Sequence, residues 1–181
     1  IVEEVKLDAI KKKMDIGQLD RDELTAFLVD HGLGVDCSGF LYHVLNAELT
    51  AHGSSLKRAL KFPNASIFRT LIQKLRTKEN ASVRVFADEK NSTSVTLSDI
   101  TPGDFIVRLK GGTSNDRDHV LFVHAVDYAD TTPKRILYAH ADEWTVDGKY
   151  GHGVRRGEIE IIDTQLDLLN QTWGERGKSG E

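Results

Sequence analysis

The spacing of apolar residues in this chain changes from helix-like to strand-like near residue 80. Before that point apolar side chains recur every three or four residues, and beyond it they alternate with polar ones. The spacing predicts helices over residues 1–13, 21–30, 37–49 and 65–76. It predicts strands over residues 83–86, 105–109, 120–127, 136–141 and 158–162. Helices followed by strands indicate an α+β fold whose second half forms an antiparallel sheet.

Polar residues mark where these helices begin. Asp20 followed three residues later by Glu23 is the pattern of a capping box, in which each side chain accepts a hydrogen bond from the other residue's backbone N–H. Asp36 is expected to cap the helix that starts at Cys37, and Asn64 is expected to cap the last helix. These caps place Cys37 at the N-terminus of a helix.

Length and composition exclude several classes of protein. The chain has 181 residues, of which 39% are hydrophobic and 29% charged, and this suits one globular domain. Its apolar runs are shorter than the ~20 residues that span a bilayer. A net charge of −4 argues against a dedicated nucleic-acid binder, and a single cysteine excludes a disulfide framework or a zinc site of several thiolates. Because the chain opens at Ile1, we expect a processed or excised segment, and its compartment stays open.

The net charge conceals an uneven distribution. Residues 55–84 hold eight lysine and arginine residues against one acid, Glu79, so this segment carries +7 and the remainder −11. Such a basic lobe on an acidic body is suited to attract an anionic substrate. A solvated helix face is the alternative interpretation of the same charges.

Cys37 lies between Asp36 and Ser38 at the predicted start of a helix. A thiol with the ordinary pKa of ~8.5 is mostly protonated at neutral pH. The dipole and the unpaired N–H groups of a helix N-terminus stabilise the thiolate instead. The same N–H groups can donate to an oxyanion that forms on an attacked carbonyl. The position therefore suits a nucleophile, and a small hydrophobic residue of the core is the alternative.

A thiolate nucleophile needs a base, and the chain has seven histidines. His119 begins one predicted strand and His140 lies in the next. Because the connection near residues 130–134 is short, these strands are expected to pair, and the two imidazoles can meet if the hairpin is long or bulged. Two hydrogen-bonded core histidines are the alternative. A metal site of His119, His124 and His140 is a further alternative, although strand alternation sends His119 and His124 to opposite faces.

Four short motifs stand in order within residues 30–162. They are Asp36-Cys37-Ser38-Gly39-Phe40, Thr101-Pro102-Gly103-Asp104-Phe105-Ile106, Asp118-His119-Val120 and Tyr138-Ala139-His140-Ala141. They resemble the Asp-Cys-Ser-Gly, Pro-Gly-Asp, His-Val and Ile-His-Ala segments of the NlpC-type cysteine peptidases, which are papain-like bacterial enzymes that cut peptide stems of the cell wall. The ordered set is more specific than any one of its motifs.

The resemblance implies a papain-like NlpC-type fold, in which a helical N-terminal half packs on an antiparallel sheet. It implies hydrolysis of an amide in a cell-wall-type peptide, without cofactor or metal, by a triad of Cys37 as nucleophile, His119 as base and His140 as the residue that orients His119. Asp36 and Ser38 are implied as substrate-binding residues. A secreted or cell-envelope location is favoured by the same resemblance.

Arg155 is a further candidate for substrate binding. It lies in the Gly-rich segment 151–157, which is predicted to be a loop, where a guanidinium can pair with a substrate carboxylate. An ordinary turn with solvated charges is the alternative.

The predicted organisation has a helical segment over residues 1–30, a catalytic domain over residues 31–173 and a flexible tail over residues 174–181. Residues 55–98 are expected to be a basic helical insertion, because the interval between the cysteine and the first strand histidine is longer than usual in the family. Two other functions stay open, namely acyl transfer by the same triad and a non-catalytic module that binds an anionic polymer. The sequence does not indicate an oligomeric state.

Overall fold

A computed structural model describes residues 2–31, 33–63, 66–109, 118–142, 151 and 153–176. The chain forms two compact units. The first combines residues 1–36 with residues 142–153, and the second combines residues 37–141 with residues 154–181. The sequence places the end of the N-terminal helical segment at residue 30, whereas the first unit extends through Asp36.

The first unit contains the helices α1 (Val2–Lys12) and α2 (Arg21–Asp30), at the positions that the apolar spacing predicts. The predicted capping box is confirmed at the start of α2. The side chain of Asp20 accepts a hydrogen bond of 2.9 Å from the backbone N–H of Glu23, and the Asp20 N–H donates to the Glu23 side chain at 3.0 Å. These two bonds satisfy donors that a helix end otherwise leaves without a partner, so the start of α2 is determined locally.

The helices of the second unit follow one another along the chain. They are α3 (Cys37–Ala51), α4 (Leu56–Ala59), α5 (Ile67–Leu75), α6 (Thr77–Asn80) and α7 (Val83–Phe86). The start of α3 at Cys37 agrees with the prediction, whereas α5 is shorter than the predicted helix and is capped by the side chain of Ser66. The expected cap, Asn64, lies outside the described residues. No helix in the described part of the chain is long and apolar enough to cross a membrane.

The prediction of a strand over residues 83–86 is wrong, because these residues form α7. Ser82 caps this helix by accepting a hydrogen bond from the backbone N–H of Val85. Val83 and Phe86 are three residues apart, so they share one face of the helix, and both are buried. Within four residues a helical and an alternating apolar pattern look alike, and the core contact distinguishes them.

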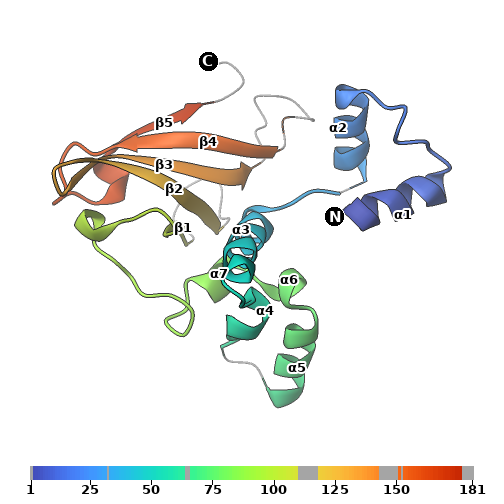
Figure 1. Ribbon diagram of the computed structural model, residues 1–181, viewed down its shortest axis with the longest axis horizontal. Coiled ribbons are helices and arrows are strands. Elements are labelled where there is room, and N and C mark those ends of the chain that lie inside the picture. Colours follow the sequence, from blue (N-terminus) through green and yellow to red (C-terminus); the bar gives the residue numbers. More distant parts are fainter. Residues whose placement is uncertain are drawn as a thin grey trace. The chain divides into compact units, whose positions relative to one another are not determined.

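The second half of the chain forms a five-stranded sheet in the order β1-β2-β3-β4-β5 (Figure 1). Its strands are β1 (Phe105–Arg108), β2 (His119–Ala129), β3 (Thr132–Asp142), β4 (Gly153–Glu160) and β5 (Thr172–Arg176). The pairs β1–β2, β2–β3 and β4–β5 are antiparallel. Short 3-10 helices cover Leu97–Asp99 and Leu168–Asn170. The predicted α+β class is therefore confirmed.

Two segments near the C-terminus are more regular than predicted. β4 begins at Gly153, so much of the Gly-rich segment 151–157 is a strand rather than a loop. β5 pairs with β4 through Arg176, so the first residues of the predicted flexible tail belong to the sheet. Residues 177–181 lie outside the described residues. Glycine and charged residues lower strand propensity, and pairing with a neighbouring strand overrides this local preference.

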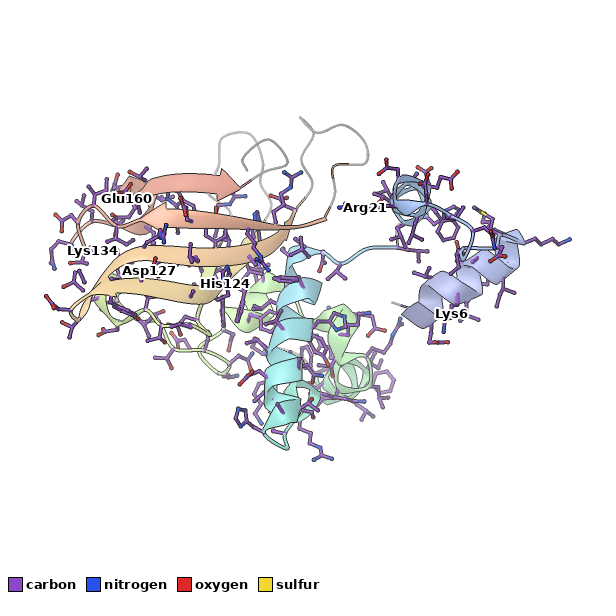
Figure 2. The ribbon with its side chains drawn as sticks, turned by 45° about the horizontal axis from the view of Figure 1, so that its top comes forward. Lys6, Arg21, His124, Asp127, Lys134 and Glu160 are labelled. Carbon is purple, nitrogen blue, oxygen red and sulfur yellow. The ribbon has the colours of Figure 1, made fainter. Side chains whose placement is uncertain are left out.

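β2 and β3 form a long hairpin, as the meeting of two histidines on these strands requires. Asp130 in its turn has a φ of 55°, in the left-handed region that tight turns use. The register shifts at His124 and again after Asp127, so the hairpin is bulged as well as long. Figure 2 shows Asp127 and Lys134 toward the turn and His124 farther along the hairpin.

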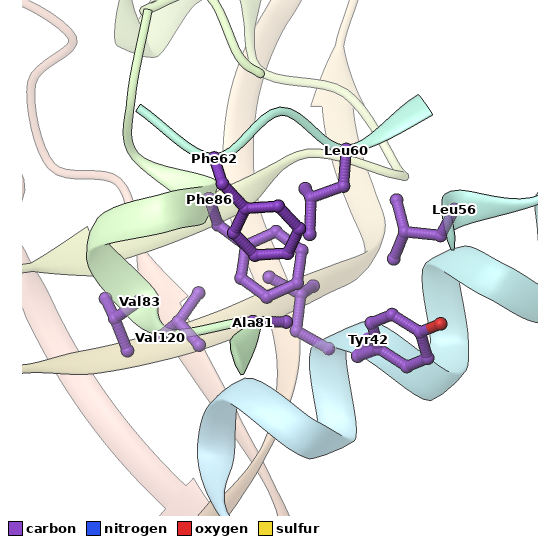
Figure 3. Packing of buried hydrophobic residues seen from close by; sticks show 9 residues of the cluster. Tyr42, Leu56, Leu60, Phe62, Ala81, Val83, Phe86 and Val120 are labelled. Atoms are coloured by element: carbon purple, nitrogen blue, oxygen red, sulfur yellow. The ribbon is translucent and has the colours of Figure 1, made fainter. Parts of the chain in front are cut away.

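Alternate side chains of β2 enter two separate hydrophobic clusters. The helical core comprises Leu41, Tyr42, Leu56, Leu60, Phe62, Ala81, Val83, Phe86 and Val120 (Figure 3). The sheet core comprises Ile100, Leu121, Val123, Ile136, Tyr138, Ile159 and Ile161. Val120 belongs to the first cluster and Leu121 to the second, because successive side chains of a strand point to opposite faces. β2 thus joins the helices to the rest of the sheet.

Candidate active site

His119 and His140 lie beside each other on the paired strands β2 and β3. The distance from His119 Nε2 to His140 Nδ1 is 2.7 Å, and the ring centroids lie 5.0 Å apart at an interplanar angle of 83°. At this distance one ring donates the proton that the other accepts. His140 is 2% exposed, whereas His119 is half-buried at the first position of its strand. The contact therefore joins a buried imidazole to a more accessible one, and the expected meeting of the two rings is observed.

The position of His140 depends on close packing around Tyr138. This tyrosine is fully buried, and its ring centroid lies 5.6 Å from that of His140 and 5.8 Å from that of Trp173. Gly157 of β4 provides the space that the tyrosine ring occupies, since a Cβ at this position would lie 2.3 Å from ring atoms of Tyr138. This role of Gly157 was not predicted from the sequence. The available signal was a glycine within a strand, which often marks a close approach.

Arg84 of α7 holds the residue that precedes His119. Its Nε donates to Asp118 Oδ2 at 2.7 Å, and its Nη2 donates to Asp118 Oδ1 at 3.3 Å. This bidentate pair ties α7 to the start of β2, so it limits the directions that the backbone of His119 can take. In the sequence Arg84 is one of the eight positive charges of the basic lobe, and its pairing with Asp118 was not predicted because 34 residues separate the two partners.

Cys37 is the first residue of α3, and its side chain is half-buried against the helical core. α3 contacts β2, and in Figures 1 and 2 the start of α3 lies beside the end of the sheet at which β3 ends. Because β2 and β3 are antiparallel, β2 begins at this same end, with His119. Cys37, His119 and His140 thus belong to one compact unit and lie toward one end of its sheet.

The three residues implied in substrate binding have different surroundings. Ser38 is buried in the first turn of α3, next to Cys37. Asp36 is exposed and ends the N-terminal segment of the first unit. Arg155 is half-buried on β4, which the strand β3 separates from β2. Of these three residues, Ser38 is the one that shares a helix with the cysteine.

Three other histidines have separate environments. His31 Nδ1 lies 2.7 Å from a backbone oxygen of its own helix α2, and His52 Nε2 lies 3.0 Å from a carboxylate oxygen of Glu48. His124 lies at the register shift of β2, where partial burial and then the nearby charge of Arg156 lower its pKa. A lowered pKa keeps this imidazole neutral over a wider range of pH than in an unfolded chain.

One group among the described residues offers ligand atoms for a metal ion. Its members are His119, His140 and Asp142, whose candidate ligand atoms all lie within 4.8 Å of one another. Two nitrogens bound to one tetrahedral zinc ion lie about 3.3 Å apart. The 2.7 Å between the two histidine nitrogens is shorter and fits a shared proton better than two zinc ligands. His124 is not a member of this group, so the alternative metal site that included it is not formed.

Comparison of the chain with models of protein families, with curated proteins and with solved structures finds no match. The resemblance to the NlpC-type peptidases therefore depends on the four sequence motifs. Cys37, His119 and His140 each lie in one of those motifs.

Proposed function

We propose that this protein is a papain-like cysteine hydrolase of the NlpC type that cleaves an amide bond in a cell-wall-type peptide. Cys37 is the nucleophile, His119 the general base and His140 the residue that orients His119. The observation that carries the proposal is the hydrogen bond of 2.7 Å between the two imidazoles. A base held by a second polar group that is itself buried is the arrangement that keeps a catalytic imidazole in one tautomer.

In the proposed triad the two nitrogens of His119 have different roles. Since His119 Nε2 faces His140, the thiol of Cys37 has to deliver its proton to the other nitrogen, Nδ1. His119 must then carry its own proton on Nε2 and donate it to Nδ1 of His140. Burial of His140 disfavours a charge on that ring, so the positive charge that forms on proton transfer stays on His119.

The reaction follows the general course of thiol catalysis. The thiolate of Cys37 attacks the amide carbon, and backbone N–H groups at the start of α3 donate to the oxyanion. His119 then gives its Nδ1 proton to the leaving amine, and the acyl group remains on the sulfur. A water molecule that loses its proton to His119 releases the acyl group as a carboxylic acid. Ser38 and Asp36 contribute to the substrate site beside the nucleophile, and Arg155 pairs with a substrate carboxylate.

The pH dependence of Cys37 alkylation tests the triad without a known substrate. In the wild type we expect reaction with iodoacetamide to persist well below the ordinary thiol pKa of about 8.5. His119→Ala should move the midpoint up toward about 8.5, because no imidazolium then stabilises the thiolate. His140→Ala should move it in the same direction by less. His52→Ala, which removes an imidazole just beyond the far end of α3, is the matched control and should leave the midpoint unchanged.

An alkylation midpoint at the ordinary thiol pKa would contradict the proposed triad. A midpoint near 8.5 in the wild type and in every variant, with unchanged circular dichroism, contradicts the thiolate–imidazolium pair. Turnover of stem peptides from bacterial cell walls then tests hydrolysis itself. We expect product formation to be lost in both Cys37→Ala and His119→Ala. Retained turnover in either folded variant rules out the triad.

A further inference from the structure

The helix α5 exposes its apolar side. Phe68, Leu71, Ile72 and Leu75 follow the spacing of one helical face, and all four are exposed, with Phe68 at 74% and Leu75 at 68%. Thr70 and Gln73 lie on the other side of the helix and are half-buried. The helix therefore has the opposite orientation to that of an ordinary surface helix, which packs its apolar side on the core.

The inward side of α5 contains one buried polar atom without a hydrogen-bond partner among the described residues. This atom is Gln73 Oε1. Leaving such an atom unsatisfied costs free energy, and leaving large apolar side chains in water costs more. The exposed apolar side indicates a helix whose outward side is covered when the protein acts, because contiguous exposed apolar patches mark sites of interaction.

Positive charges border the apolar side chains of α5. A groove of about 620 Å³ is lined by Lys57 and Arg58 of α4 together with Leu71, Lys74 and Leu75 of α5, and by Ser55. Figure 1 shows α4 and α5 as neighbours in the second unit. The surrounding segment, residues 55–84, carries eight basic residues against one acid. The surface that covers α5 should therefore be negatively charged as well as apolar.

We infer that α5 and the adjacent cations of α4 bind the surface of an anionic lipid bilayer. In this arrangement the axis of α5 lies in the plane of the interface, Phe68, Leu71 and Leu75 enter the boundary between headgroups and acyl chains, and Lys57, Arg58 and Lys74 contact lipid phosphates. The inference does not depend on the proposed hydrolase activity, since none of these residues belongs to the triad. It would bring the second unit to a membrane without a spanning helix.

A bilayer accounts for the observations better than two other partners do. A soluble anionic polymer would pair with the lysines and the arginine but would leave Phe68 and Leu75 in water. A protein partner would need a pocket shaped to receive these projecting side chains. A fluid interface accepts apolar side chains without a matching pocket and supplies negative charge beside them.

Cosedimentation with vesicles tests the inference. We expect the wild type to bind vesicles of equal parts phosphatidylcholine and phosphatidylglycerol, and to bind phosphatidylcholine vesicles at least about tenfold more weakly. The double variant Phe68→Ser, Leu75→Ser should weaken binding to the anionic vesicles at least about tenfold. The triple variant Lys57→Gln, Arg58→Gln, Lys74→Gln should weaken it similarly and reduce its dependence on salt.

Two matched control variants distinguish binding through this surface from nonspecific adsorption through other exposed side chains. Leu169→Ser removes an exposed leucine from the C-terminal 3-10 helix, and Lys134→Gln removes an exposed lysine from the β2–β3 hairpin. Both should bind anionic vesicles as the wild type does. Phe68→Trp adds a fluorophore at the proposed contact without removing apolar area. Its emission, taken as the difference from wild type, should shift to shorter wavelength and be quenched by brominated lipid when anionic vesicles are added.

Several results would overturn the inference. Equal binding to neutral and anionic vesicles, or no binding to either, excludes an anionic bilayer as the partner. Binding that polyphosphate abolishes and that survives Phe68→Ser, Leu75→Ser identifies a site for a soluble polyanion instead. A dimer that forms without lipid and dissociates in the same double variant shows that a second copy of the chain covers α5.

Discussion

The helices α3 and α5 belong to the same unit, yet their apolar side chains have opposite surroundings. Leu41 and Tyr42 of α3 are buried in the helical core, whereas Phe68, Leu71 and Leu75 of α5 are exposed. The difference lies in the neighbours. α3 contacts β2, a strand that offers Val120 to the same core, while α5 contacts the short helix α6 and none of its described side chains belongs to the helical core. Amphipathic spacing thus predicts a helix without predicting what covers its apolar side.

The two helices also have different roles in the molecule. α3 carries Cys37 and is held against the strand that carries His119, so its packing serves the geometry of the proposed triad. α5 contributes little to the core and presents side chains outward. Substitutions in the two regions should therefore have different effects, with stability affected near α3 and the sheet, and binding affected at α5.

The largest contrast is expected between two leucines. Leu41→Ala removes a side chain that is 1% exposed and should lower the free energy of unfolding by about 2–5 kcal/mol, since it leaves a cavity in the helical core. Leu71→Ala removes the same atoms from a side chain that is 58% exposed and should change it by no more than about 0.5 kcal/mol. Urea denaturation of both variants measures the difference. Equal losses would show that α5 packs its apolar side inward, as α3 does.

A second contrast concerns two glycines of neighbouring strands. Gly157→Ala places a methyl group where the buried ring of Tyr138 lies, so we expect a loss of about 1–3 kcal/mol in the free energy of unfolding. Gly174→Ala, on the paired strand β5, meets its nearest atom at 3.5 Å and should be tolerated. Because Tyr138 contacts His140, Gly157→Ala should also raise the midpoint of Cys37 alkylation. Thermal unfolding and alkylation together check this prediction, and a neutral Gly157→Ala would contradict the close packing behind His140.

The smallest contrast concerns two arginines of the basic segment. Arg84 pairs with Asp118, and a double-mutant cycle with Arg84→Gln and Asp118→Asn should give a coupling energy of up to about 1 kcal/mol, limited by solvent screening of a partly exposed pair. The cycle of Asp118→Asn with Arg69→Gln, on exposed α5, should give a coupling energy near zero. Similar values in both cycles would mean that Arg84 acts through the general charge of the segment rather than through this contact.

The features that were predicted correctly depend on residues close together in sequence. The Asp20–Glu23 capping box is formed by hydrogen bonds within a few residues, and α3 begins at the residue that the local sequence pattern predicted. The contact of His119 with His140 follows from a hairpin, the simplest pairing of consecutive strands. The α+β class follows from the order of the apolar patterns along the chain.

The features that were missed depend on residues far apart in sequence. Residues 83–86 were predicted as a strand, and they form α7 because Val83 and Phe86 both reach the helical core. The pairing of Arg84 with Asp118 and the packing of Gly157 on Tyr138 join different elements of the fold. Neither contact exists until those elements have come together.

The sequence by itself determined where α2 and α3 begin, that helices precede a hairpin-built sheet, and that a cysteine at a helix start precedes two strand histidines. Only the tertiary structure decided that His140 is buried behind His119, that Arg84 holds Asp118, and that α5 turns its apolar side to solvent. The physical reason is the range of the interactions. Caps and alternation act within a few residues, whereas burial depends on which distant surfaces meet.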